Sequence, residues 1–251
     1  MSESKGTVLI TGASRGIGAA TARLAAKRGY DVAVNYVANA AAAAKVVGEV
    51  EAVGRRAVAI KGDVGREADI LAVFETVDKK LPQLAALVNN AGIAGKICRV
   101  EDVDAATIRS VMDVNVTGAM LCAREAVKRM STRRGGKGGV IVNISSGAAT
   151  TGSPENYVWY AASKAALDAM TMGLGLEVAR DGIRVVGVGV GVTDTEIHAA
   201  LGVPGRPQKM ADRIPLGRPA EPVEMAEAIL FLMSDAARYC TATTLRAGGG
   251  L

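Results

Sequence analysis

The chain has 251 residues, of which 49% are hydrophobic, so it is long enough to bury one large core. Its net charge is +5, its 30 lysines and arginines are scattered, and only 3% of its residues are aromatic, which argues against a nucleic-acid-binding protein. No apolar run approaches the roughly 18 residues of a membrane span, and its 3 cysteines are widely spaced, which favours reduced thiols. We therefore expect a cytoplasmic protein with no nucleic-acid or membrane partner, and we predict no metal site.

Short runs of apolar and β-branched residues alternate with stretches of helical periodicity. Strands are predicted at 7–11, 31–36, 57–60, 86–90, 139–145 and 183–188, with a short last strand near "TTLRA". Helices are predicted at 17–28, 40–53, 66–80, 104–130, 157–180 and 222–234, the second of them capped by Asn39. Continuous apolar strands indicate a sheet covered on both faces, hence a parallel one. The predicted fold is a single Rossmann-like doubly wound α/β domain over residues 1–251, with about seven parallel strands and helices on both faces.

The stretch "TGASRGIG" at 11–18 follows the first strand directly and contains Gly12, Gly16 and Gly18. Glycines in the first strand-to-helix turn let the backbone approach a pyrophosphate at the helix N-terminus. The alternative is a tight turn that binds no ligand. Arg15 favours the first interpretation, because a guanidinium in such a turn is best explained by an anionic partner, although a solvated side chain is also open.

The end of the second strand indicates which dinucleotide is bound. An NAD site usually has an acidic residue about twenty residues after the glycines, where it accepts hydrogen bonds from the ribose hydroxyls. Here Tyr36 and Val37 occupy that place. No carboxylate repels a 2′-phosphate and Arg15 is available to attract one, so NADP is favoured, with NAD possible.

Tyr160 and Lys164 in "YAASK" lie four residues apart, on one face of a predicted helix. A nearby ammonium stabilises a phenolate and lowers the pKa of the phenol, which suits an acid/base group. Ser145 and Ser146 end the fifth strand at the same edge of the sheet as the glycine turn, where a hydroxyl can bond a substrate carbonyl. Taken separately, the Tyr–Lys pair could be an exposed helix surface and the serines a turn cap.

Together these motifs resemble the short-chain dehydrogenase/reductase family, over residues 5 to 250. "TGASRGIG" is similar to its TGxxxGxG motif, "NNAG" at 89–92 to the motif that ends its fourth strand, and "YAASK" to its YxxxK motif. "NISS" resembles its catalytic-serine strand, and "DVNVTG" contains the asparagine of its fourth helix.

The resemblance implies a Ser-Tyr-Lys-Asn mechanism. Tyr160 would be the general acid/base, Lys164 would lower its pKa and bind the nicotinamide ribose, Ser146 rather than Ser145 would orient the carbonyl, and Asn115 would hold a relaying water. The residues expected to bind the cofactor are Gly12, Ser14, Arg15, Gly16, Ile17, Gly18, Tyr36, Asp63, Val64, Asn90, Ala91, Gly92, Tyr160, Lys164, Gly191 and Thr193. Val186 and Val190 depart from the family pattern, which has Asn and Pro at these places.

The predicted function is NADP(H)-dependent hydride transfer between nicotinamide and a ketone or secondary alcohol, under a substrate lid at about 193–215. The alternative is a non-catalytic NADP-binding sensor or scaffold on the same fold. The predicted helices 104–130 and 157–180 carry more apolar residues than one stripe facing the sheet needs. Together with the family resemblance, these extra apolar residues predict a homotetramer or homodimer. These residues are Met112, Val116, Met120, Ala169, Met170 and Gly173.

Overall fold

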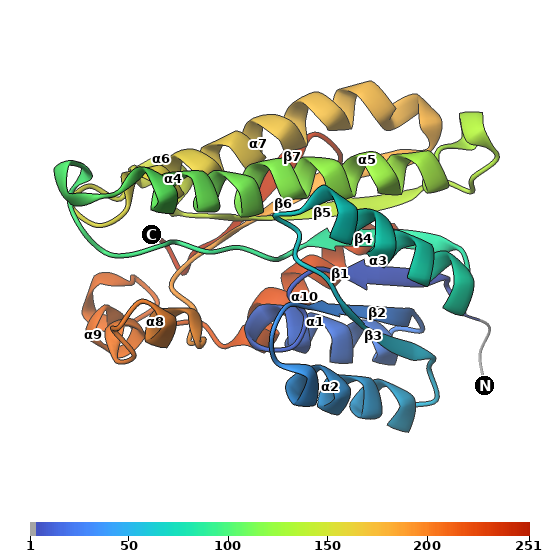
Figure 1. Ribbon diagram of the computed structural model, residues 1–251, viewed down its shortest axis with the longest axis horizontal. Coiled ribbons are helices and arrows are strands. Elements are labelled where there is room, and N and C mark those ends of the chain that lie inside the picture. Colours follow the sequence, from blue (N-terminus) through green and yellow to red (C-terminus); the bar gives the residue numbers. More distant parts are fainter. Residues whose placement is uncertain (1–3) are drawn as a thin grey trace.

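The computed structural model describes residues 4–251, apart from the side chains at positions 198 and 200 (Figure 1). The strands are β1 (Thr7–Ile10), β2 (Asp31–Tyr36), β3 (Ala57–Lys61), β4 (Leu84–Asn89), β5 (Gly139–Ser146), β6 (Ile183–Val190) and β7 (Thr243–Ala247). The helices are α1 (Gly16–Lys27), α2 (Ala40–Ala52), α3 (Glu67–Lys80), α4 (Ala105–Met112), α5 (Ala119–Met130), α6 (Ala148–Thr151), α7 (Val158–Val178), α8 (Ile197–Ala200), α9 (Arg206–Lys209) and α10 (Pro222–Met233).

The strands form one parallel sheet in the order β3-β2-β1-β4-β5-β6-β7. This confirms the predicted doubly wound α/β fold. The chain moves outward from β1 to β3 in one direction, then returns to β4 on the other side of β1. In such sheets the reversal between the two central strands leaves a crevice at their carboxyl ends, where ligands bind.

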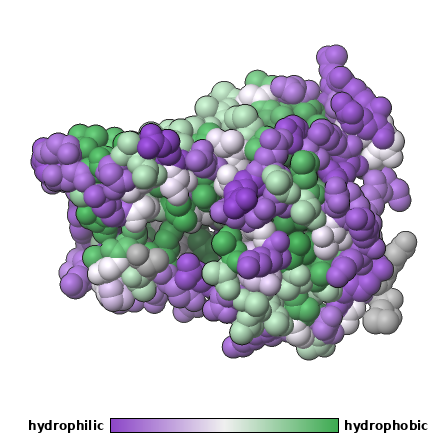
Figure 2. All heavy atoms as spheres, viewed as in Figure 1, coloured by the Kyte–Doolittle hydropathy of each residue, from purple (hydrophilic) through white to green (hydrophobic). Residues whose placement is uncertain are grey.

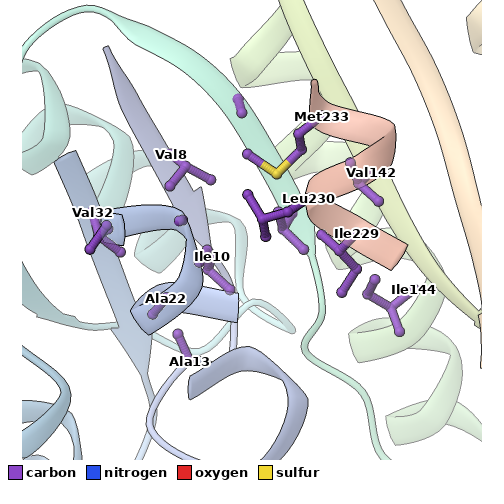
Figure 3. Packing of buried hydrophobic residues seen from close by; sticks show 14 of the residues in the cluster. Val8, Ile10, Ala13, Ala22, Val32, Val142, Ile144, Ile229, Leu230 and Met233 are labelled. Atoms are coloured by element: carbon purple, nitrogen blue, oxygen red, sulfur yellow. The ribbon is translucent and has the colours of Figure 1, made fainter. Parts of the chain in front are cut away.

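Helices cover both faces of the sheet. One face packs against α1, α2 and α10, with Val8 and Ile10 of β1 pointing toward them (Figure 3). The intervening residue, Leu9, points to the opposite face, where α3, α5 and α7 pack. Alternate side chains of a strand point to opposite faces, so a strand that is apolar at every position requires both faces to be covered.

Several boundaries differ from the predictions. The predicted helix over 104–130 is interrupted by a π-helical segment, Asp113–Gly118, between α4 and α5. The short helices α6, α8 and α9 were not predicted, and the last two lie within the predicted lid at 193–215. The predicted cap of α2 is confirmed, because the Ala42 amide donates to Asn39 Oδ1 at 2.9 Å. Within residues 4–251 the structure contains no helix both long and apolar enough to cross a bilayer.

Candidate active site

A cleft of about 1020 Å³ opens at the carboxyl ends of the strands. Its walls come from the turns after β1, β2, β4 and β5, from the start of α7, and from residues 190–213. Figure 2 shows this side of the molecule hollowed beside the segment that carries α8 and α9. The cleft therefore lies where the reversal of strand order predicts a ligand.

The glycine turn forms one wall of the cleft. Gly12 and Gly16 have φ values of +63° and +53°, in the left-handed region that favours glycine. A Cβ on Gly12 would lie 3.1 Å from Ala91 Cα, so a side chain there would crowd the backbone of the neighbouring turn. Helix α1 begins at Gly16 with no side-chain cap from Arg15, so its first amides remain available for an anion.

The turn after β4 is locked onto the glycine turn. Asn90 Nδ2 donates to the carbonyl oxygens of Thr11 at 2.8 Å and Gly12 at 3.1 Å. Thr11 Oγ1 in turn accepts from the backbone amides of Asn90 and Ala91, both at 3.0 Å. A Cβ on Gly18 would come within 2.6 Å of Asn90 Nδ2. Gly18 therefore permits close packing behind the cleft, whereas Gly12 and Gly16 line it.

The carboxyl end of β2 forms the far end of the cleft. Tyr36 and Val37 line it beside Arg15, whose side chain is exposed and makes no hydrogen bond or ion pair with the described residues. Asn35, directly before them, is buried; its Nδ2 donates to Gly62 O at 2.9 Å, and its Oδ1 accepts from the Gly12 amide at 3.3 Å. Asn35 thus fixes the glycine turn against the second strand.

Ser146 and Tyr160 meet at the inner end of the cleft. Ser146 is the last residue of β5 and Tyr160 lies in the first turn of α7, and both line the cleft. Burial raises the pKa of Tyr160 to about 12, against a hydrogen bond with Ser146 that lowers it. Ser145 is only 1% exposed, and its Oγ donates to Lys164 O at 3.3 Å. The geometry therefore favours Ser146 over Ser145 as the serine that contacts a ligand.

Lys164 lies one helical turn after Tyr160. Its Nζ donates to Ile144 O at 2.7 Å and is 5.6 Å from the centre of the Tyr160 ring. Burial lowers the pKa of Lys164 to about 8, while nearby Asp168 raises it. The sequence predicted that the ammonium lowers the pKa of Tyr160. In this structure burial of the phenol is the largest influence on the pKa of Tyr160, and it raises that pKa.

Asn115 is completely buried in the π-helical segment, beside the cleft. Its Nδ2 donates to Ile93 O at 2.8 Å and to Ser163 Oγ at 2.9 Å, and its Oδ1 accepts from the Ile93 amide at 2.9 Å. A Cβ on Gly92 would lie 3.3 Å from Lys164 Nζ and 3.4 Å from Asn115 Oδ1, so both polar atoms flank the same glycine. Widened helical turns of this kind often occur at functional sites.

The structure brings nearly all the predicted site residues to the cleft. Gly191 and Thr193 line it after β6, and Asp63 and Val64 line it after β3. Ser14, Ile17, Ala91 and Gly92 line it as well, and only Gly18 and Asn115 lie just outside its wall. At Val190, where the family pattern has proline, β6 continues as a strand and Val190 pairs with both Ser146 of β5 and Ala247 of β7. Among the side chains that the structure describes, no group of three or more His, Cys, Asp or Glu residues could hold a metal ion.

Some residues that shape the cleft were not predicted. Thr11 and Asn35 fix the glycine turn through hydrogen bonds to residues far along the chain, and Arg206 reaches the cleft from α9. Polar residues at the ends of apolar strands are the one signal that could have pointed to the first two. Arg206 lies within the predicted lid at 193–215, but no motif in that segment distinguishes it from its neighbours, so only the fold shows that its side chain reaches the cleft.

Comparison with known proteins agrees with this geometry. A model of the short-chain dehydrogenase/reductase family, described as enoyl-(acyl carrier protein) reductase, matches residues 12–251. The chain belongs to the short-chain dehydrogenase/reductases. The predicted enzyme class, an NAD(P)-dependent short-chain dehydrogenase/reductase, is thereby confirmed.

Among relatives of this short-chain dehydrogenase/reductase, the uncharacterized oxidoreductase YgfF of Escherichia coli K12 is 49% identical over 96% of this chain and 98% of its own length. A cis-4-hydroxycyclohexanecarboxylate dehydrogenase of Sinomonas cyclohexanicum is 38% identical, over 96% of this chain and 94% of its own. A 3-oxoacyl-[acyl-carrier-protein] reductase of a Synechocystis species is 36% identical, over 97% of this chain and 95% of its own.

Solved structures superpose closely on this short-chain dehydrogenase/reductase. A short-chain dehydrogenase from Burkholderia cenocepacia J2315 in complex with NADP gives a TM-score of 0.89 at 32% identity, covering 97% of this chain and 96% of that chain. A 3-ketoacyl-(acyl-carrier-protein) reductase from Brucella melitensis complexed with NADH gives 0.90 at 33% identity, covering 99% of both chains.

Proposed function

We propose that this enzyme moves a hydride between NADP(H) and a ketone or secondary alcohol. The observation that carries the proposal is the convergence of Ser146, Tyr160 and Lys164 at the inner end of the cleft that the glycine turn opens. A protein that only binds a dinucleotide needs the glycine turn but has no use for a phenol, a hydroxyl and an ammonium placed together at the inner end of the cleft.

The residues of the cleft fit a dinucleotide. Gly12 and Gly16 have positive φ values that favour glycine, a Cβ on Gly12 would crowd Ala91, and the uncapped amides at the start of α1 suit a pyrophosphate. Asp63 and Val64 would contact the adenine, and Asn90, Ala91 and Gly92 would border its ribose. Lys164 would hold the nicotinamide ribose, beside Gly191 and Thr193. When bound, the cofactor supplies the hydride.

The protein's own side chains supply the proton and position the substrate carbonyl. Because the pKa of Tyr160 is raised to about 12, its phenol is protonated at neutral pH and can donate to the oxygen of a carbonyl undergoing reduction. Ser146 would hold that oxygen and stabilise its developing negative charge. Lys164 would neutralise the phenolate that remains, and Asn115 would hold a water that returns a proton toward Lys164.

NADP is preferred over NAD in this proposal. Arg15 is an exposed cation whose side chain pairs with no carboxylate among the described residues, and it lines the cleft beside Tyr36 and Val37, which stand where an NAD site usually has an acidic residue. The Arg15 guanidinium would attract a 2′-phosphate there, and no acidic side chain at the end of β2 would repel it. That one similar structure holds NADP and another NADH is consistent with NADP as the preferred cofactor and NAD as a possible one.

We also propose that the protein is cytoplasmic and forms a homodimer or homotetramer. Its three cysteines are unpaired, which suits a reducing compartment. Helices α5 and α7 lie side by side (Figure 1) and expose apolar side chains at Met120, Met172 and Leu176, which are 52%, 58% and 71% exposed. Met170, in contrast, packs partly against the internal core, so it is a poorer marker of this face.

A panel of ketones and secondary alcohols tests the proposal, with NADPH oxidation or NADP⁺ reduction followed by absorbance. The panel includes short-chain and cyclic ketones, their alcohols, and a 3-oxoacyl thioester. We expect turnover that requires Tyr160. NADPH binding with no turnover anywhere in the panel would instead favour a sensor or scaffold.

A further inference from the structure

Arg206 places a half-buried cation on the substrate side of the cleft. Its guanidinium carbon lies 5.3 Å from the centre of the Tyr157 ring, and its Nη2 donates to Asn156 Oδ1 at 3.3 Å. The Tyr157 ring is perpendicular to that of Tyr160, with the two centres 5.3 Å apart. Because both distances are 5.3 Å, the guanidinium carbon lies within about 11 Å of the centre of the Tyr160 ring, whose hydroxyl is the proposed proton donor.

The partner of this guanidinium is fixed in place by the loop before α7. Asn156 Nδ2 donates to Pro154 O at 2.8 Å, which leaves Oδ1 directed at Arg206, and Asn156 O accepts from the Cys98 amide at 2.9 Å. Glu155 has a φ of +63°, in the left-handed region, and its carboxylate lies 3.5 Å from Arg99. Backbone strain of this type persists only where the surrounding contacts impose it.

No carboxylate among the described residues pairs with Arg206. Glu155 lines the same cleft but is engaged by Arg99, and Glu196 lies at the cofactor end beside Gly16. A second arginine of the cleft, Arg246, is already bonded to Thr150 Oγ1 at 2.7 Å and Leu251 O at 2.6 Å. The Arg206 guanidinium has five N–H donors and uses one of them for Asn156. Its remaining N–H groups are therefore available to a ligand.

We propose that the substrate carries a carboxylate, bound by Arg206 while its carbonyl faces Tyr160. The inference rests on the proposed function and specifies its substrate class as a compact keto acid or hydroxy acid. Because the guanidinium lies so near Tyr160, the carboxylate and the carbonyl belong to one small molecule, separated by a short carbon chain or a single ring. A bidentate Arg–carboxylate pair would fix both ends of such a molecule.

The test uses two matched pairs of probes, 4-oxopentanoate and its methyl ester, and 4-oxocyclohexanecarboxylate and its methyl ester. Calorimetry measures their binding to the NADP⁺-saturated protein, and initial rates with NADPH give KM and kcat. The variants are Arg206→Ala, Arg206→Lys, and Lys209→Ala as the control. Lys209 is an exposed cation on the same short helix that does not line the cleft. Thermal melting and NADPH titration verify that each variant is folded.

We expect at least one acid to bind the parent more tightly than its ester. Arg206→Ala should weaken that acid roughly 10- to 100-fold and raise its KM, with the ester unaffected. Arg206→Lys should bind the acid with an affinity between those of the parent and Arg206→Ala, because a lysine keeps the charge but cannot form a bidentate pair with a carboxylate. Lys209→Ala should bind the acid as tightly as the parent does.

Three results would overturn the carboxylate site. These are a parent that binds no acid more tightly than its ester, an equal loss of affinity for acid and ester in Arg206→Ala, and a loss of affinity for the acid in Lys209→Ala as large as that in Arg206→Ala. The proposed function is judged separately. Tyr160-dependent reduction of a neutral ketone supports it even where Arg206 proves irrelevant. Arg206-dependent binding of an acid without any turnover supports the carboxylate site and contradicts the oxidoreductase.

Discussion

The ammonium of Lys164 donates a 2.7 Å hydrogen bond to the carbonyl oxygen of Ile144. The bond ties α7 to the end of β5 beside Ser146, and it buries a cation that is 4% exposed. Burial disfavours the charged form of an amine, and accordingly the pKa of Lys164 is lowered to about 8.

This burial predicts how stability depends on pH. A lysine whose pKa is about 8 in the folded state and 10.5 unfolded binds fewer protons when folded, so the free energy of unfolding rises with pH between those values. Lys164→Met removes the titration. The stability of the parent relative to this variant should increase by about 2 kcal/mol from pH 7.5 to pH 9.5, as measured by urea unfolding. A pH-independent difference would show that the ammonium is not desolvated.

Tyr160→Phe should abolish turnover while leaving NADPH affinity nearly intact. The hydroxyl is needed for proton transfer, which contributes roughly 10²–10⁴-fold to the rate, whereas the ring packing survives the change. Tyr157→Phe is the matched control, since its ring lies perpendicular to that of Tyr160 on the same helix end. Steady-state kinetics and NADPH fluorescence titration separate the two effects. Retention of near-parental kcat by Tyr160→Phe would remove this residue from the mechanism.

Arg15→Ala should weaken NADPH binding much more than NADH binding. Only NADPH carries the 2′-phosphate that the exposed guanidinium would pair with, and a charge-assisted bond of this kind is worth about 1.5–3 kcal/mol, or about 10- to 150-fold. Lys27→Ala, which removes an exposed cation from the other end of α1, is the control. Fluorescence titrations with NADPH and NADH give the loss of affinity for each cofactor in each variant. An equal loss of affinity for NADPH and NADH would show that Arg15 contacts the pyrophosphate or stabilises the glycine turn, and does not pair with the 2′-phosphate.

Two glycine substitutions should have opposite effects on stability. Gly18→Ala would place a Cβ 2.6 Å from Asn90 Nδ2 and 2.7 Å from Gly12 O, forcing apart the turns that line the cleft. We expect a lower melting temperature and weaker cofactor binding. Gly48→Ala in α2 meets nothing within 4 Å and should stabilise the helix by about 0.5–1 kcal/mol. Thermal melts of both variants measure this, and a neutral Gly18→Ala would contradict the packing argument.

Leu176→Glu should reduce the size of the assembly. Leu176 is 71% exposed on α7, and twofold symmetry would place two introduced carboxylates at one interface. Val53→Glu, on a residue 45% exposed at the end of α2, is the control. Light scattering should show a dimer or tetramer of the 25.7 kDa chain for the parent and the control, and a smaller species for Leu176→Glu. A monomeric parent would end the assembly proposal.

The sequence by itself determined the order of the strands and of most of the longer helices, together with many residues of the cleft. Apolar β-branched runs predict buried strands because a parallel sheet is covered on both faces, and Gly12 and Gly16 predict a backbone turn that only glycine adopts easily. Tyr160 and Lys164 could be paired from the sequence because four residues make one helical turn. These are local regularities, which a sequence carries directly.

Tertiary structure alone decided the environment of those residues. Burial, not the neighbouring ammonium, sets the direction of the Tyr160 pKa, and the Lys164 ammonium bonds to a strand carbonyl twenty residues away. A π-helical segment replaces the predicted regular helix at Asn115, and the side chain of this residue bonds to Ile93 and Ser163 in distant parts of the chain. Arg206 reaches the cleft only because the chain returns there after β6. Desolvation and contacts between distant segments depend on how the whole chain packs, and no local pattern encodes them.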